Sequence, residues 1–372
     1  MNTRFQIDNS KNASERVLLI AVEFPDTKDF PAVLAEAQEL VYAAGGDLIT
    51  TATCKREKPH NALFVGTGKI EEYKQIVDDN NIQLVIFNHA LTPSQERNIE
   101  QSLQCRVLDR IGLILSIFAM RAQSSEGKLQ VELAQLEHLS SRLIRTYGHL
   151  KSQRGGIGLK GPGETQLETD RRLIAQKIVR IKKRLQEVKK IRTIQRKNRS
   201  KLPTFTLVGY TNVGKSTIFN ALTKSNVIAK DQLFATLDTT ARKLWLNENL
   251  SIILMDTVGF VRDLPHKLIV AFSATLEEVK NADILLHVID ASDTHAQEHT
   301  ENVNQVLTEI GAGEIPQILV YNKIDCTDNK IAEIQKDNLS NIKALRISAN
   351  DRESLKLLYE TIEETAQKLN KY

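Results

Sequence analysis

Short apolar runs alternate with amphipathic segments over the first third of the chain. Continuous apolar or β-branched runs predict buried strands, which lie at residues 16–22, 47–53, 83–87 and 106–109. Apolar positions at helical spacing predict helices, which lie at residues 30–44, 68–80 and 93–103. Gly45 and Gly46 end the first helix, and Thr92 caps the third. This alternation is typical of a small parallel-sheet α/β domain, expected over residues 15–110 after a disordered segment at 1–14.

The pattern then changes to heptad spacing. Apolar positions recur every four and three residues over 129–150, and again over 174–188. Two such helices predict an antiparallel helical hairpin within residues 111–201. Its tip, residues 155–163, holds five glycines and one proline. Such a tip can approach a nucleic-acid backbone closely, with Arg154 and Lys160 supplying charge, or it can be a flexible hinge.

After Pro203, strand and helix patterns alternate again to the end of the chain. Buried-strand runs lie at 205–208, 252–255, 317–321 and 345–347, and a helix is predicted at 352–371. Each of these strands leads into a polar motif. We therefore predict that residues 202–372 form a second α/β domain, which makes the whole chain an α/β protein with a helical hairpin between its two sheets.

The first motif is the phosphate-binding loop pattern G-x-x-x-x-G-K-[ST], here called the P-loop. Its residues are Gly209, Tyr210, Thr211, Asn212, Val213, Gly214, Lys215, Ser216 and Thr217. The two glycines allow the backbone N–H groups to face phosphates, Lys215 reaches the β- and γ-phosphates, and the Ser216 hydroxyl binds Mg²⁺. Lys215 is therefore a predicted catalytic residue.

The second motif follows the strand at 252–255 and consists of Asp256, Thr257, Val258 and Gly259. Asp256 is expected to hold a water of the Mg²⁺ shell. The Gly259 N–H is expected to contact the γ-phosphate and so to report whether GTP or GDP is bound.

Two further motifs predict guanine specificity. They are Asn322, Lys323, Ile324 and Asp325, and then Ser348 and Ala349. The Asp325 carboxylate can accept hydrogen bonds from guanine N1–H and N2–H₂, whereas adenine offers neither donor. A backbone N–H at 348–349 can meet the guanine O6. The four motifs occur in the order and approximate spacing of the Ras-like P-loop GTPases, and this resemblance implies such a domain over residues 202–372.

The loop that senses the γ-phosphate is predicted within residues 231–240. Its nucleotide-binding residues are Phe234, Ala235, Thr236, Leu237 and Asp238. Thr236 is the preferred second protein ligand of Mg²⁺, with Thr239 and Thr240 as alternatives.

Phe260 stands where Ras carries the glutamine that orients the attacking water, and a phenylalanine cannot hydrogen-bond water. Intrinsic hydrolysis is therefore expected to be slow until a partner, a backbone group or a monovalent cation completes the site. Asn212 is a candidate ligand for K⁺, and its alternative role is to cap the P-loop.

Composition adds one feature, a strongly basic segment. Residues 151–201 contain 17 Lys and Arg against 4 acidic residues, a local charge of +13 in a chain of net charge +4. This segment predicts a nucleic-acid-binding surface, and the alternative is a solvated helix face. The three cysteines have no metal-ligand spacing, and no membrane span or signal peptide is apparent. A monomer in the reducing cytoplasm is expected.

Several blocks together resemble the HflX family of ribosome-associated GTPases. They are residues 65–69, 88–97, 107–114, 126–134, 234–238 and, most specifically, 155–172 (GGIGLKGPGETQLETDRR). The resemblance implies binding to the large ribosomal subunit and its rRNA through the basic hairpin and glycine-rich tip. It further implies splitting of stalled or idle ribosomes under stress, and GTP/GDP and Mg²⁺ as cofactors. Thr239 departs from the family's usual proline, and the C-terminal extension of some relatives is not expected here.

Two other functions remain open from the sequence. In one, the hairpin is an RNA or ribosome clamp whose position GTP sets, and hydrolysis is incidental. In the other, the 151–201 segment acts on free RNA. Binding of large subunits without nucleotide would favour the clamp.

Overall fold

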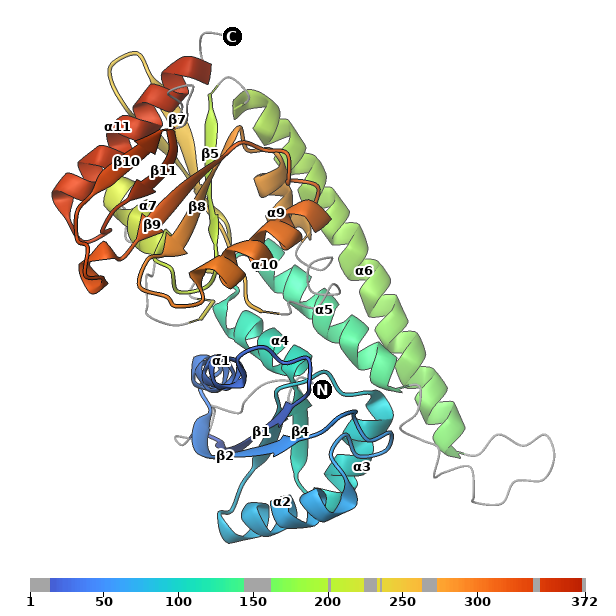
Figure 1. Ribbon diagram of the computed structural model, residues 1–372. Helices are drawn as coiled ribbons and strands as arrows, with labels where there is room; N and C mark the ends of the chain where they lie inside the picture. Colours follow the sequence, from blue (N-terminus) through green and yellow to red (C-terminus); the bar gives the residue numbers. More distant parts are fainter. Residues whose placement is uncertain are drawn as a thin grey trace. The chain divides into compact units, whose positions relative to one another are not determined.

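A computed structural model describes residues 14–143, 162–199, 202–223, 233–234, 236–262, 273–336 and 342–369 (Figure 1). Contacts within the chain divide it into two compact units. The first contains the chain up to Met120 together with Lys128–Gln186, and the second contains Arg121–Gly127 together with the chain from Glu187 onward. The short segment 121–127 therefore belongs with the C-terminal half of the protein, although it lies early in the sequence.

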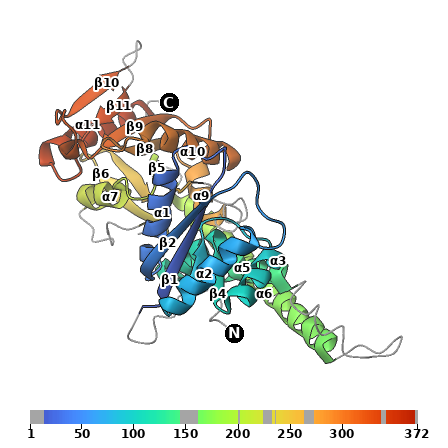
Figure 2. The same ribbon diagram turned by 60° about the horizontal axis from the view of Figure 1, so that its bottom comes forward.

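The first unit is built on a four-stranded, fully parallel sheet with strand order β2-β1-β3-β4. The strands are β1 (Arg16–Glu23), β2 (Asp47–Lys55), β3 (Leu84–Phe87) and β4 (Arg106–Asp109). Helix α1 (Phe30–Ala43) lies on one face of this sheet, and α2 (Thr67–Asp79) and α3 (Pro93–Leu103) lie on the other (Figure 2). Alternate residues of β1, such as Leu18 and Ile20, point into the core beneath α2 and α3. The predicted parallel α/β domain is confirmed.

Local signals predicted the ends of these helices to within one residue. Thr92 forms a capping box with Gln95, so α3 begins at Pro93 as predicted. Helix α1 ends one residue before the predicted position, and Gly45 follows it in the left-handed region with φ of 77°.

Helix α4 (Arg110–Arg121) follows β4 directly and was not predicted. Nearly every residue from Gly112 to Phe118 is buried, so the segment lacks the polar face that gives a helix its 3.6-residue period. A helix that is apolar all round is hard to distinguish from a buried strand by pattern alone.

The two predicted hairpin helices are α5 (Ser125–Leu143) and α6 (Pro162–Arg199). In the first unit they lie side by side (Figure 1), linked by ion pairs of Glu132 with Lys177 at 2.7 Å and of Glu137 with Lys182 at 2.8 Å. Helix α6 continues to residue 199, well past the heptad pattern that ended at 188. The connection at 144–161, with most of the glycine-rich tip, lies outside the described residues.

Buried charges fix the end of α5 within the first unit. Arg142 bonds Asp109 of β4 at 2.8 Å, contacts Glu96 of α3, and donates to His138 at 2.8 Å. Asp109 is 1% exposed. Removing one partner of such a buried pair typically costs ~3–5 kcal/mol, because the other charge is left unpaired. This network therefore holds α5 against β4 and α3.

The second unit contains a seven-stranded sheet with order β10-β11-β9-β8-β5-β7-β6. Its strands are β5 (Thr204–Gly209), β6 (Thr240–Trp245), β7 (Ser251–Asp256), β8 (Ile284–Asp290), β9 (Gln317–Asn322), β10 (Glu333–Lys336) and β11 (Ile342–Arg346). Only the edge strands β6 and β10 pair antiparallel to their neighbours. Helices α7 (Lys215–Thr223) and α11 (Arg352–Leu369) contact each other on one face, and α9 (Ser273–Lys280) and α10 (Ala296–Glu309) lie on the other (Figure 1).

The parallel strands bring the motifs to one edge of this sheet. The P-loop follows β5, Asp256 ends β7, and Asn322 ends β9. In open α/β sheets the carboxyl ends of the strands form the ligand site. The P-loop α/β architecture predicted for the C-terminal part of the chain is thereby confirmed, and its candidate site lies at this edge.

Candidate nucleotide site

The P-loop runs from the end of β5 to the start of α7 and depends on its two glycines. Gly209 and Gly214 have φ of 146° and 95°, a region that other residues rarely adopt. A Cβ on Gly209 would collide with the Val288 carbonyl, and one on Gly214 would collide with the Asn322 amide. The loop therefore keeps the backbone geometry that lets its N–H groups face phosphates.

Lys215 is buried at the centre of this loop, with 6% of its surface exposed. Its amine donates to the carbonyls of Gly209 at 3.1 Å and Tyr210 at 2.5 Å. Burial lowers the pKa of Lys215 to about 8, and the nearby charge of Asp256 opposes that shift. The amine is thus held inside the loop, where a bound polyphosphate would supply better acceptors and restore the pKa.

This lowered pKa predicts proton uptake on nucleotide binding. At pH 8.5 the Lys215 amine should be largely neutral in the free protein and charged beside GDP, so binding should take up roughly 0.5–0.8 proton. At pH 7 the amine is already charged and the uptake should fall to about 0.1 proton. Calorimetry in two buffers of different ionisation enthalpy, without Mg²⁺, measures this. A binding enthalpy at pH 8.5 that does not depend on the buffer would contradict the prediction.

Three side chains that could bind a metal meet beside Lys215. The Ser216 hydroxyl lies 2.7 Å from Thr236 Oγ1 and donates to Asp256 Oδ2 at 2.7 Å. Asp256 is fully buried, and its other oxygen, Oδ1, has no partner among the described residues. Burial raises the pKa of Asp256, against the Ser216 hydrogen bond and the charge of Lys215. Two hydroxyls and an unsatisfied carboxylate form an all-oxygen set that fits Mg²⁺.

Two of the three threonines proposed as metal ligands have different surroundings. Thr236 contacts Ser216, whereas Thr240 begins strand β6 opposite Asp256 in the β7 ladder. Phe234 and Leu237 are buried on either side of Thr236, at 1% and 2% exposure. Ala235 lies outside the described residues.

Asp238 does not face the nucleotide site. Its carboxylate accepts hydrogen bonds from the N–H groups of Gln123 and Ser124, both at 2.8 Å, and from the Ser124 hydroxyl. The sequence pattern gave no signal for this contact, because the partners are 114 and 115 residues apart.

The loop after β7 is paired with the P-loop. The Thr211 N–H donates to the Phe260 carbonyl at 2.7 Å, and the Phe260 N–H donates to the Gly209 carbonyl at 3.2 Å. Phe260 is 2% exposed, so its side chain is buried rather than presented to a substrate water. Gly259 packs so closely on Thr211 and the Lys215 amine that a Cβ would lie 3.0 Å or less from both. Within the same motif, Thr257 Oγ1 donates to the Leu207 carbonyl at 2.7 Å, and Val258 is buried.

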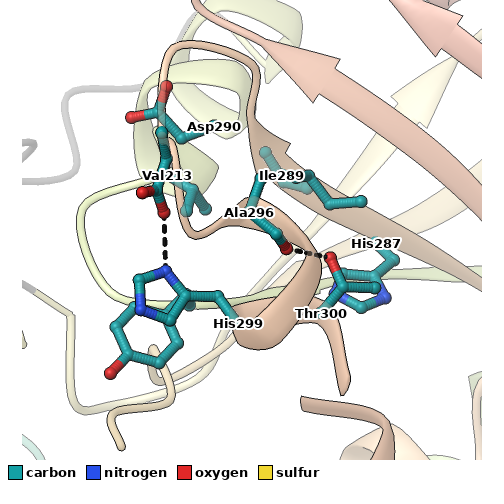
Figure 3. A pocket seen from close by; sticks show the side chains of 10 residues that line it. Val213, His287, Ile289, Asp290, Ala296, His299 and Thr300 are labelled. Atoms are coloured by element: carbon teal, nitrogen blue, oxygen red, sulfur yellow. Dashed lines mark hydrogen bonds and ion pairs between the residues drawn. The ribbon is translucent and has the colours of Figure 1, made fainter. Parts of the chain in front are cut away.

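Tyr210 connects the P-loop to this loop and to α10. Its hydroxyl accepts the Arg262 N–H at 2.5 Å, and its ring stacks on His299 with centroids 3.9 Å apart. His299 in turn bonds Asp293 at 2.6 Å and lines a small cavity behind the P-loop (Figure 3). None of these partners was predicted, since the isolated His and Asp carry no motif.

Asn322 joins three parts of the base-binding region. Its amide donates to the Val213 carbonyl at 2.8 Å and accepts the Ala349 N–H at 2.9 Å. Lys323 pairs with Asp290 at 2.8 Å. Ile324 and Asp325 follow in a short 3-10 helix, and a hydrogen bond from Ser348 holds the pKa of the exposed Asp325 below its usual value. The Ala349 N–H is occupied by Asn322, so its role toward guanine O6 remains a prediction.

Two residues of the P-loop lie at its outer side. Asn212 is exposed in the left-handed region with φ of 61°, and within the described part of the chain its side chain makes no hydrogen bond. Capping of the loop by this side chain is therefore not observed. Thr217 follows in the first turn of α7.

Three family models match the chain in succession. They describe a GTP-binding GTPase N-terminal region at residues 32–119, a GTP-binding GTPase middle region at 121–199 and a 50S ribosome-binding GTPase at 204–323. Together they match both units of the structure.

Relatives that match over most of the chain establish its family. The GTPase HflX of Escherichia coli (strain K12) is 49% identical over 95% of this chain and 83% of that protein. The chain belongs to the HflX family of GTPases. The HflX of Magnetococcus marinus is 48% identical over 84% of this chain and 74% of its own length. A GTP-binding protein from the archaeon Sulfolobus solfataricus, crystallised with GDP, has 26% identity and a TM-score of 0.50 over 95% of this chain and 99% of that chain.

Because the chain is an HflX GTPase, the protein binds GTP and GDP and hydrolyses GTP in its P-loop domain. None of the helices described for this HflX chain is both long and apolar enough to cross a bilayer.

Proposed function

We propose that this HflX protein binds the large ribosomal subunit in the cytoplasm, as a monomer, and separates stalled or idle ribosomes, with GTP hydrolysis resetting it. The observation that carries the proposal is the basic surface of α6. Nine exposed cations lie along twenty residues of this helix: Arg171, Arg172, Lys177, Arg180, Lys182, Lys183, Arg184, Lys189 and Lys190. The match of residues 204–323 to a 50S ribosome-binding GTPase model supports the same partner.

Charge pairing within the protein leaves most of these cations available. Lys177, Lys182 and Lys189 pair with acidic side chains, whereas the other six form no ion pair within the described residues. Twenty helical residues extend about 30 Å, a length that crosses several backbone phosphates of an RNA helix. Phosphate contacts by these residues would position the protein on rRNA, independently of base sequence.

The nucleotide site supports a mechanism in which neutralisation of the phosphate charge is the main contribution to catalysis. Ser216 and Thr236 would hold Mg²⁺ directly, and Asp256 would hold it through water. A bound Mg²⁺ would supply positive charge beside the phosphates, and the Lys215 amine would add a second positive group there. Gly259 lies close to the Lys215 amine, and its N–H would contact the γ-phosphate. Because Phe260 is buried, the water-orienting group must come from the ribosome, from a backbone group or from K⁺ at Asn212.

GTP turnover measured with and without large ribosomal subunits, in K⁺ and in Na⁺, tests the proposal. We expect strong stimulation by subunits, on the order of 10²-fold or more, because the partner completes the site. An Arg180→Glu, Arg184→Glu variant should lose the stimulation and keep its basal rate, while Arg180→Lys, Arg184→Lys should retain both. GTP turnover that is already fast without ribosomal subunits, and does not change when they are added, would contradict the proposal. Tight subunit binding that needs no nucleotide at all would instead favour the clamp.

A further inference from the structure

The segment 121–127 and the γ-phosphate-sensing loop form one hydrogen-bonded cluster. Asp238 accepts the N–H groups of Gln123 and Ser124 through Oδ2 and the Ser124 hydroxyl through Oδ1. The Ser124 oxygen also accepts the Gly127 N–H at 2.8 Å, in the first turn of α5. A single serine thus caps α5 and binds Asp238.

The fit of the carboxylate against this turn is close. Gly127 lies directly over Asp238, and a Cβ at position 127 would collide with Oδ1 and Ser124 Oγ. The carboxylate also lies at the N-terminus of α5, where free N–H groups and the helix dipole favour negative charge. Both the charge of residue 238 and the absence of a side chain at residue 127 are therefore needed for this contact.

Only Leu237 separates Asp238 from Thr236. Leu237 is 2% exposed, so the backbone between the two residues is fixed by burial on one side and by Ser124 on the other. The Thr236 hydroxyl, at the far end of this short stretch, meets Ser216. Movement of Asp238 by even 1 Å would displace the Thr236 hydroxyl from a metal position that tolerates little misplacement.

We propose that Ser124 is a positioning residue for GTP hydrolysis, acting through Asp238 to hold Thr236 where it meets Mg²⁺ and the γ-phosphate. The inference rests on the proposed role of Thr236 as a metal ligand. It assigns part of the GTPase site to a residue 85 positions before the first glycine of the P-loop. Linkage makes the effect reciprocal, so a γ-phosphate that orders Thr236 also stabilises the first turn of α5. From Lys128 onward the same helix belongs to the first unit.

The test compares Ser124→Ala with Ser125→Ala, a matched control at the next, exposed position of α5. We expect Ser124→Ala to bind a fluorescent, non-hydrolysable GTP analogue with Mg²⁺ about tenfold more weakly and to lower single-turnover hydrolysis by about tenfold, because a hydrogen bond to a charged group is lost. GDP affinity should change less than about twofold, since GDP does not use the sensing loop. Ser125→Ala should match the unaltered protein in all three measurements.

A double-mutant cycle with Asp238→Asn separates this role from simple capping of α5. If Ser124 acts through Asp238, the double variant should lose no more GTP-analogue affinity than the worse single variant, whereas independent effects would add. Additive losses, or equal weakening of GDP and the GTP analogue, would overturn the inference. Thr236→Ala distinguishes the two levels. If neither Ser124→Ala nor Thr236→Ala changes analogue binding, the role proposed for Thr236 is wrong. If Thr236→Ala weakens analogue binding and Ser124→Ala does not, only the role of Ser124 is wrong.

Discussion

Lys215→Ala should reduce kcat/KM for GTP by roughly 10²–10³-fold or more, since it removes a preorganised positive group from the position of the γ-phosphate. The amine is buried, and its hydrogen bonds to described residues go to carbonyl oxygens of the P-loop. Part of the loss should appear as weaker nucleotide binding, because the amine contacts both ground state and transition state.

The same substitution should not unfold the protein. A lysine whose pKa is lowered by burial disfavours the folded state at pH 7 relative to one left in water, and alanine removes that cost. The melting temperature without nucleotide should therefore stay within a few degrees of the unaltered protein. Lys69→Ala is the matched control, because Lys69 also follows a glycine but lies exposed on α2 beside Glu72. Unchanged turnover by folded Lys215→Ala protein would refute the mechanism.

The parts that could be predicted from the sequence depend on short-range signals. Each motif follows a buried strand directly, and the chemistry of its residues is specific. As a result, the P-loop, Asp256 and Asn322 could be placed at one sheet edge without tertiary information. Thr236 was preferred over Thr239 and Thr240 on pattern alone, and the structure places its hydroxyl beside Ser216.

The features that were missed lack a periodic or local signature. Helix α4 is buried all round, and the end of α6 is so rich in charge that its apolar spacing disappears before the helix ends. The contacts of Asp238 with Ser124 and of Tyr210 with His299 join residues about 114 and 89 positions apart. Such pairs depend on the folded sheet, and Asp238 was accordingly predicted to face the nucleotide when it faces α5.

Base recognition depends on Asp325, and Asp325→Asn should invert the preference between guanine and xanthine nucleotides. The carboxylate is an acceptor only, which suits the N1–H and N2–H₂ donors of guanine. An asparagine amide would direct its own N–H₂ toward the guanine N2–H₂, leaving two donors opposed, whereas the xanthine O2 would accept that donor. We expect GDP affinity to fall roughly 10²–10⁴-fold and xanthosine diphosphate affinity to rise above it.

Displacement of a fluorescent nucleotide by GDP and by xanthosine diphosphate measures both affinities in one assay. Asp328→Asn, in the exposed loop that follows, is the matched control and should leave the preference unchanged. The P-loop and the Asn322 contacts remain in the Asp325 variant, so phosphate binding should persist. Only the contribution of base recognition to nucleotide affinity should change. A variant that still prefers GDP would mean that guanine is read elsewhere, most directly by the backbone at 348–349. Because Ser348 lowers the pKa of Asp325, that outcome would make the carboxylate a support for this loop rather than the group that selects the base.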